Sequence, residues 1–333
     1  MTQHHATEHR AVATVPNGQP SYQPVPPAPW PQQNAHTIRS DAEALERARQ
    51  FADHIAPGAL VRDQQRILPW EEVQAFSQSG LWGITIPREY GGAGVSTATL
   101  TQAVATIAAA DGNFGHIPQN HYYALEVLRV GGSPAQKQFF YERVLRGERL
   151  GNALAETGHK DFQRRTQLLR ETGGWFVHGQ KFYCTGAIFA HWIPTLVSAQ
   201  EDGGENQYLV FIPRDAAGVT ITDDWDGFGQ RVTGSGSVQF ERVKVEPEWV
   251  VPFKVSFDTP STIGPFAQII HAALDAGIGH GALAATLPFI RDHARPWIDA
   301  RVERASDDPV RWKYHHIGNH ALNGIHPPRH GAI

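Results

Sequence analysis

Cysteine is almost absent from this chain, and so is any strong imbalance of charge. A single cysteine, Cys184, among 333 residues excludes an internal disulfide framework and favours a cytoplasmic location. The formal net charge of -4 gives no reason to expect nucleic acid or an anionic membrane as a partner. No apolar run is predicted to be long enough to span a bilayer, and the N-terminus lacks the charged-then-apolar pattern of a signal peptide.

Proline, in contrast, is concentrated at the N-terminus. Residues 1–35 have few apolar side chains, and their composition cannot bury enough surface to offset the entropy lost on ordering. We therefore predict that this segment is a disordered or extended arm. Its prolines are Pro16, Pro20, Pro24, Pro26, Pro27, Pro29 and Pro31.

Helical patterns dominate residues 36–149. Ser40 is a suitable N-cap, and apolar residues then recur at helical spacing until Pro57 and Gly58, where we expect the helix to end. The stretch 81–87 is predicted to be extended. Further helices are predicted over about 69–79, 97–110, 118–129 and 134–146.

The pattern changes at residue 150. From 150 to 255 short β-type runs alternate with Gly, Asp and Pro, which predicts a compact β-domain, a small barrel or sandwich. Residues 256–308 return to helix, with a long Ala/Gly/Ile/Leu-rich run over 264–294 whose glycines permit close helix–helix approach. The predicted runs of the β-domain are 175–179, 208–212, 219–221 and 237–240.

Three segments carry the chemical signal: 151–157, 179–186 and 225–237. Each places small and hydroxyl residues beside an aromatic residue at the end of a strand-like run, as a β-domain needs to hold a flat ring edge-on. Their order and spacing resemble the flavin-binding middle domain of the acyl-CoA dehydrogenase superfamily. The chain is most similar to the flavin-dependent monooxygenase branch, which includes dibenzothiophene monooxygenases and sulfur-acquisition oxidoreductases. The resemblance covers residues 40–308 and implies an α+β fold: an N-terminal helical domain, a middle β-domain and a C-terminal helical bundle.

The resemblance also implies roles for residues of the three segments. Asn152 begins the first flavin segment, which includes Leu154, and its amide would donate to an oxygen adduct of the flavin. Tyr183 stands where the family has a ring-packing Trp, and the Thr185 hydroxyl is expected near flavin N5. Without the resemblance, Asn152 is equally well read as a strand-end turn residue and Thr185 as an ordinary edge residue.

The third segment adds an aromatic residue and an arginine. Trp225 is expected to line the flavin or substrate pocket. Arg231 matches the Gly-x-Arg-x-Thr run of the family, although a structural pairing with Asp224 or Asp226 is the alternative. In the family, a bundle arginine helps to hold the flavin phosphate, and Arg295 is the nearest candidate.

Two histidines flank the start of a predicted helix. The resemblance implies that one histidine in this region faces flavin C4a, where it would donate to or protonate a flavin hydroperoxide. His116 and His121 are both candidates, and the sequence does not choose between them. Each would otherwise be a surface or capping histidine. Tyr122 lies in the same region and is expected to line the substrate pocket.

The sequence lacks the base that the dehydrogenase reaction needs. Residues 259–274 contain no Asp or Glu, and Asp275 does not align with the family's catalytic carboxylate. Oxygenation needs no such base, because reduced flavin itself reacts with O2. The family's pyrophosphate segment is altered at 157–161, which favours FMN, with FAD as the alternative.

We therefore expect a two-component monooxygenase that oxygenates a small organosulfur compound such as dimethyl sulfone. Reduced FMN would come from a separate NAD(P)H:flavin reductase, and the protein would form a homo-oligomer if its bundle is complete. One alternative is an acyl-CoA dehydrogenase-like FAD oxidoreductase. The other is a truncated, inactive remnant, because residues 309–333 form a His-rich tail where the family continues its bundle. His316 and His320 have the spacing of a helical metal pair, but no acidic or cysteine ligand accompanies them, so no metal site is predicted.

Overall fold

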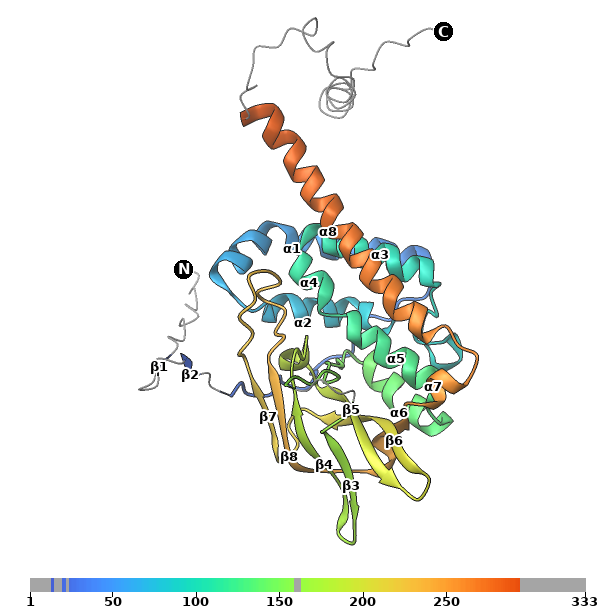
Figure 1. The fold of residues 1–333 in the computed structure, drawn as a ribbon. Coiled ribbons are helices and arrows are strands. Elements are labelled where there is room, and N and C mark those ends of the chain that lie inside the picture. The colour runs from blue at the N-terminus through green and yellow to red at the C-terminus, as the bar shows by residue number, and fades with distance from the viewer. Residues whose placement is uncertain (1–12, 15–19, 22–23, 159–162, 294–333) are drawn as a thin grey trace, which may run out of the picture. The chain divides into compact units, whose positions relative to one another are not determined.

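The computed structural model describes residues 13–14, 20–21, 24–158 and 163–293. The chain divides into two compact units, Met1–Gly277 and Ile278–Ile333, and the packing described below belongs to the first. Figure 1 shows helices over one part of this unit and a twisted sheet over the other. The predicted α+β fold, with an N-terminal helical domain followed by a β-sheet domain, is confirmed.

The first helix is longer than the sequence predicts. Helix α1 runs over Asp41–Gln65 and begins as expected at Ser40, whose side chain accepts a hydrogen bond from the Glu43 backbone N–H. Pro57 lies inside the helix, so the predicted end at Pro57 is wrong. A proline removes one helical hydrogen bond, but this helix packs along α3 and continues to Arg66, which caps it in the left-handed conformation with φ 53°.

Four of the remaining N-terminal helices match the predicted ranges closely: α2 (Trp70–Ser79), α3 (Thr97–Ala110), α5 (Gln119–Gly131) and α6 (Pro134–Leu145). The short α4 (Gly112–His116) was not predicted, and two short 3-10 turns form at Leu81–Gly83 and Arg88–Tyr90. The extended stretch predicted at 81–87 is therefore wrong where the first turn forms. A cluster of aromatic rings fills the core between α1, α2 and α4: Phe76 lies 4.9 Å from Phe51 and 4.6 Å from Trp82, measured between ring centroids.

The β-domain contains one seven-stranded sheet. Its strands are β3 (Gln167–Glu171), β4 (Gly174–Lys181), β5 (Trp192–Glu201), β6 (Gly204–Pro213), β7 (Val219–Thr222), β8 (Ser237–Val245) and β9 (Val250–Pro252). Their order is β7-β8-β4-β3-β5-β6-β9, and all neighbours are antiparallel except β3 and β5. The sheet is open, with β7 and β9 at its edges, whereas the sequence suggested a barrel or sandwich. Strands β3, β5 and β9 have no counterpart among the predicted runs.

The last part of the proline-rich segment packs on the folded domain. Val25 donates its backbone N–H to Ile221, extending the sheet beyond β7, and Trp30 stacks on His191 with ring centroids 5.2 Å apart. Ala28 and Ala35 are buried. Residues 24–35 are therefore extended, which is one of the two predicted alternatives, and they are attached to the folded domain. The short strands β1 (Ala13–Thr14) and β2 (Pro20–Ser21) pair with each other.

A long helix follows the sheet. After the short α7 (Val255–Asp258), α8 runs over Ile263–His293 and contributes residues to both units. A Cβ at Gly277 would lie 2.4 Å from the Ala105 carbonyl oxygen, so the predicted close approach occurs there, against α3. Arg295 and the His-rich tail lie outside the described residues.

Helix α8 is also long and apolar enough to cross a membrane. Its stretch Ile263–Ile290 has a mean hydropathy of 1.2, so the prediction that no apolar run reaches this length is wrong. Long apolar helices also occur in the bundles of soluble proteins, and one such helix is weak evidence for a membrane span.

Candidate functional site

A cleft of about 380 Å³ lies between the end of α4 and the loop that precedes β8. Its lining combines residues of two of the three sequence segments, 179–186 and 225–237, with one histidine of the helical domain. No residue of 151–157 is among the lining residues. Of the predicted site residues, four line it: His116, Tyr183, Thr185 and Trp225. The other lining residues are Gly227, Phe228, Gly229, Gln230 and Ser235.

The cleft floor carries a chain of buried hydroxyl groups. Thr185 Oγ1 lies 2.8 Å from Ser235 Oγ, which lies 2.6 Å from Thr233 Oγ1. The Thr233 hydroxyl donates to the Gln230 carbonyl at 2.9 Å. Since each hydroxyl has one proton, Ser235 donates to Thr233 and Thr185 donates to Ser235. This chain holds Thr185 in place and leaves its oxygen able to accept a hydrogen bond from a group in the cleft.

Aromatic rings form the cleft wall. Tyr183 and Trp225 meet edge to face, with ring centroids 6.1 Å apart, and Tyr183 remains 56% exposed. Tyr183 has φ 55°, a left-handed conformation that is unfavourable for a tyrosine. Such strain persists where the surrounding structure imposes it, and it is frequent at ligand sites. The two rings can pack against a flat ligand.

Asn152 reaches this wall from the neighbouring segment. Residues 150–155 lie beside the start of β5 through parallel bridges from Leu150 to Trp192 and from Ala153 to Thr195. From there the Asn152 amide donates to the Tyr183 carbonyl at 3.2 Å, while its Oδ1 atom is buried and has no hydrogen-bond partner among the described residues. Asn152 therefore lies behind the cleft wall, where it holds the Tyr183 backbone, and its Oδ1 remains able to accept a hydrogen bond.

Leu154 lies farther along the same segment and does not line the cleft. Its carbonyl accepts from Arg164 at 3.1 Å, beside the buried pair formed by Lys181 and Glu156. The Lys181 side chain is 0% exposed and its Nζ lies 2.6 Å from Glu156 Oε1. Burial lowers the pKa of Lys181 to about 8. Burial alone would raise the pKa of Glu156, but Lys181 and two backbone N–H groups outweigh it and bring that pKa to about 2. This pair fixes the segment rather than contacting the cleft.

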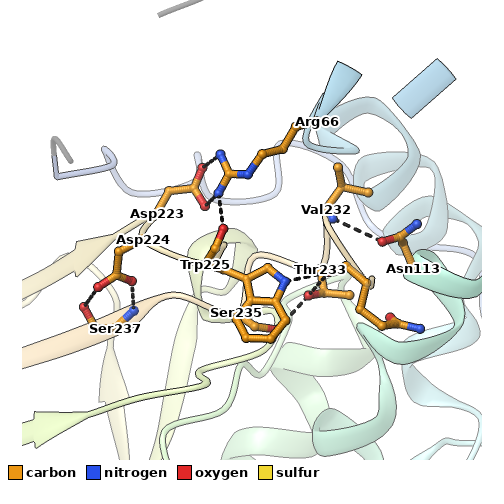
Figure 2. Close-up of polar contacts among 10 residues, drawn as sticks. Arg66, Asn113, Asp223, Asp224, Trp225, Val232, Thr233, Ser235 and Ser237 are labelled. Atoms are coloured by element: carbon orange, nitrogen blue, oxygen red, sulfur yellow. Dashed lines mark hydrogen bonds and ion pairs between the residues drawn. The ribbon is translucent and has the colours of Figure 1, made fainter. Parts of the chain in front are cut away.

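The loop that carries Trp225 is anchored at its start by Arg66. This arginine, at the left-handed end of α1, binds both carboxylate oxygens of Asp223, at 2.9 and 3.1 Å, and donates to the Trp225 carbonyl at 2.7 Å. Figure 2 shows Arg66 reaching across from the helical domain to these two residues. Asp224 instead accepts from the backbone and hydroxyl of Ser237, both at 2.7 Å.

The same loop is anchored at its far end by Asn113 and Gly112 of α4. The Val232 N–H donates to Asn113 Oδ1 at 3.1 Å, and the Gln230 amide donates to the Gly112 carbonyl at 3.1 Å. The Trp225 indole N–H donates to the Gln230 carbonyl at 2.8 Å, which closes the loop on itself. Between these anchors, the side chain of Phe228 is fully exposed at the cleft rim.

Arg231 contributes to neither the cleft nor an ion pair with its neighbours. Its guanidinium donates to the Gln64 carbonyl at 3.4 Å. The suggested pairing with Asp224 or Asp226 does not form, because Asp224 is already occupied by Ser237. Arg66, which the sequence did not single out, makes the ion pair of this loop.

The two candidate histidines have different surroundings. His121 is wholly buried: its Nδ1 accepts from the Leu150 N–H at 3.0 Å, so its Nε2 donates to the Trp82 carbonyl at 2.9 Å. Burial lowers the pKa of His121 to about 3. The neighbouring Tyr122 is equally buried, donates to the Leu81 carbonyl at 2.9 Å and does not line the cleft. Both are structural residues in this fold.

His116 lines the cleft, and its Nδ1 is buried with no hydrogen-bond partner among the described residues. Its position is fixed from below: Asp111 caps α4 by accepting from the Asn113 and Phe114 N–H groups, and a Cβ on Gly115 would lie 2.6 Å from that of Ala108. Burial lowers the pKa of His116, and nearby His271 acts in the same direction. At neutral pH this favours a neutral imidazole that can both donate and accept.

The residues around the cleft fit a flat aromatic group with polar edges. Asn152 Oδ1, His116 Nδ1 and Gln230 Oε1 are all buried without partners among the described residues, and such atoms normally bind something. Aromatic walls and a hydroxyl acceptor complete a lining that suits a flavin ring. Cys184 is buried beside Thr185, and burial raises the pKa of its thiol, so it is not a nucleophile. No cluster of metal-ligating side chains occurs among the described residues.

Comparison with known proteins agrees with this geometry. The family model of the acyl-CoA dehydrogenase N-terminal domain matches residues 40–148, and that of the middle domain matches residues 155–243. The dibenzothiophene monooxygenase of Rhodococcus erythropolis is 33% identical over 281 residues, which are 81% of this chain and 67% of that protein.

Two further relatives carry information about flavin. The probable FMNH2-dependent monooxygenase SfnC of Pseudomonas putida is 30% identical over 280 residues, 83% of this chain and 69% of that protein. The crystal structure of FMN-bound TdsC from Paenibacillus sp. A11-2 superposes with a TM-score of 0.73 at 32% identity, covering 80% of this chain and 70% of that one. Homologues of this chain are thus flavin-dependent monooxygenases, at about 30% identity.

Proposed function

Because this chain belongs to the acyl-CoA dehydrogenase superfamily, in the branch of the dibenzothiophene monooxygenases and SfnC, we propose that it is a two-component flavin-dependent monooxygenase. It would use FMN, reduced by a separate NAD(P)H:flavin reductase in the cytoplasm, to oxygenate a small organosulfur compound. The single observation that supports this most strongly is that His116, Thr185 and the two aromatic rings of Tyr183 and Trp225 line one cleft.

The residues of the cleft would hold the isoalloxazine from three sides. Tyr183 and Trp225 would pack on its face, and the Thr185 hydroxyl, which donates its proton to Ser235, would accept a hydrogen bond from one edge. Asn152, which lies behind this wall and donates to the Tyr183 carbonyl, has an unpartnered acceptor. Bound reduced FMN would supply the electrons with which O2 is activated.

His116 would handle the proton. It is the histidine of the cleft, and burial keeps its imidazole neutral at neutral pH, ready to accept a proton or to donate a hydrogen bond to a negatively charged oxygen. The aromatic loop around Trp225 would exclude water from that oxygen, which limits the wasteful release of hydrogen peroxide. The acid–base group at this cleft is thus an imidazole, as oxygenation permits, and not the carboxylate that acyl-CoA oxidation requires.

Isotope labelling tests this proposal. The purified protein would be supplied with FMN, NADH, a flavin reductase, ¹⁸O₂ and, in turn, dibenzothiophene, dimethyl sulfone and methanesulfinate. We expect one ¹⁸O atom in the product of at least one of these compounds, detected by mass spectrometry. A reaction without reductase controls for uncatalysed oxidation. Unlabelled substrate throughout, together with anaerobic bleaching of bound flavin by an acyl-CoA, would instead identify a dehydrogenase.

A further inference from the structure

A second histidine lies next to His116, on a different helix. The rings of His116 and His271 meet edge to face with centroids 6.1 Å apart. His271 lies in the part of α8 that belongs to the first unit and is partly exposed, whereas His116 lines the cleft. The pair therefore connects an imidazole of the cleft to a partly exposed one on another helix.

A carboxylate lies one helical turn beyond. Asp275 follows His271 by four residues on α8, a spacing that places both side chains on the same face of the helix, and it is exposed. Burial and the neighbouring His271 lower the pKa of His116. Gln230 of the loop and the charge of Asp275 both raise it. Tyr183, Thr185 and Ser235 face His116 from the rest of the cleft.

The pair of histidines could supply protons to the cleft. A protonated His116 that gives its proton to an oxygen in the cleft becomes neutral, so it must be protonated again before the next turnover. Two imidazoles at this separation cannot both be charged without cost, so protonation of one ring favours the neutral form of the other.

We infer that His271 is a relay residue that passes one proton between solvent and His116, with the carboxylate of Asp275 stabilising the protonated relay. This inference rests on the proposed monooxygenase function. The proton enters on His271 from water, moves to His116 and ends on the oxygen in the cleft, after which both imidazoles are neutral again. No other bond forms or breaks, and no oxidant is consumed in this step.

The electrostatic coupling is tested first, without flavin. The titration of His116 in the full chain would be followed by ¹⁵N NMR of its imidazole. We expect the pKa of His116 to rise in His271→Phe, because a like charge is removed, and to fall in Asp275→Asn. The exposed His178 of β4 provides a control, since His178→Gln should leave the His116 titration unchanged. An unchanged pKa in both test variants would overturn the relay.

Chemical rescue then tests the proton transfer itself. In the reductase-coupled assay, His271→Ala should lower product formation by roughly tenfold, a modest share of what general acid–base catalysis contributes. Added imidazole should restore part of the rate, which a merely structural role of His271 would not allow. His271→Gln, which keeps a polar side chain but cannot be protonated, should behave as His271→Ala does if the fold is intact.

The outcomes separate the relay from the function. If the wild-type protein incorporates ¹⁸O and His271→Ala does so at the same rate across pH 6–9, the relay is wrong and the monooxygenase proposal stands. If the wild-type protein forms no labelled product, the monooxygenase proposal and the relay's role in it both fail, although the NMR titration still reports whether the two imidazoles are coupled.

Discussion

The cleft and the junction between the helical and β-domains each contain histidines. The junction histidines are hydrogen-bonded through both ring nitrogens, whereas the cleft histidine is not. At the junction, His121 and His191 accept hydrogen bonds from the successive N–H groups of Leu150 and Arg149, both at 3.0 Å. Each also donates through Nε2 to a carbonyl, that of Trp82 or of Pro29. Both ring nitrogens of each histidine are therefore hydrogen-bonded.

In the cleft, His116 lacks a partner for Nδ1 among the described residues. His116 ends α4 and His121 lies in the first turn of α5, so sequence position alone does not separate them. The difference is informative because leaving a buried polar atom unpaired costs free energy. This cost is present at the cleft histidine and absent at the two junction histidines. The unpaired atom in the cleft is therefore available to a ligand.

The largest effect is expected from removing the cleft histidine. In His116→Ala, product formation should fall roughly 10²–10⁴-fold, the range typical of a lost acid–base group. The free energy of unfolding should change by less than about 1 kcal/mol, because no hydrogen-bond network is broken. Steady-state kinetics and urea denaturation measure the two quantities. Activity within a factor of three of wild type would show that His116 is not the proton-handling group.

The junction histidine should show the reverse pattern. His121→Ala leaves the Leu150 N–H and the Trp82 carbonyl unpaired and opens a cavity beside the Trp82 ring, whose centroid lies 4.6 Å away. The free energy of unfolding should fall by about 3 kcal/mol. Urea denaturation of His121→Ala and His116→Ala side by side provides the comparison, and equal losses in the two variants would remove the distinction drawn here.

Acid should lower the free energy of unfolding through the two junction histidines. Burial lowers the pKa of both His121 and His191 to about 3, from an ordinary value near 6.5 in the unfolded chain. Between these values the unfolded state binds more protons, so stability is complete above about pH 6.5 and declines as the pH falls towards 3. Each histidine should contribute on the order of 1 kcal/mol per pH unit in this window.

The control for this pH dependence is His191→Gln. This variant lacks one of the two titrating groups, so its free energy of unfolding should decline less steeply with acid than that of the wild type. Urea denaturation at several pH values from 4 to 8 measures the slopes. Parallel curves for the two proteins would contradict the assignment of His191 as a buried neutral acceptor.

A smaller effect is expected where the cleft loop is anchored. Arg66→Met removes the partly exposed ion pair with Asp223 and the bond to the Trp225 carbonyl. Partly exposed pairs contribute about 1 kcal/mol or less, so FMN binding should weaken by about fivefold through loosening of the loop. Arg49→Met, which removes an exposed pair with Glu46 far from the loop, is the matched control. Identical FMN affinities in the two variants would rule out this role of Arg66.

Much of this site could be predicted from sequence, and the reasons differ by residue. Thr185, Tyr183 and Trp225 follow strand-like runs, so their position at the edge of the sheet is a local property, and the order of the three segments carried the resemblance. Ser235, Gln230 and Arg66 were missed because their roles depend on contacts between distant segments, such as that of Arg66 with Asp223, 157 residues away. The choice between His116 and His121 likewise required burial and hydrogen bonding, which no spacing reveals.

In the fold, too, local features could be predicted from the sequence, whereas contacts between distant segments could not. Most helices and the strands β4, β6, β7 and β8 followed from periodicity, since side-chain burial repeats with the helix or strand period. The end of α1 was misplaced because Pro57 is a local signal for termination that packing along α3 overrides. The attachment of residues 24–35 was missed because it depends on backbone pairing with β7 and on the stacking of Trp30 on His191, which composition does not encode.

The central claim is that this cleft binds reduced flavin through Thr185 and the paired rings, and an anaerobic titration tests it most directly. Reduced FMN would be added to the full chain while tryptophan fluorescence is recorded, with Trp225→Leu and Thr185→Val as cleft variants and Arg49→Met as control. The account predicts saturable quenching with one FMN bound per chain, a smaller quench in Trp225→Leu, and weaker binding in Thr185→Val. Absence of saturable binding by the wild-type protein, or equal affinity and quenching in all four proteins, would contradict it.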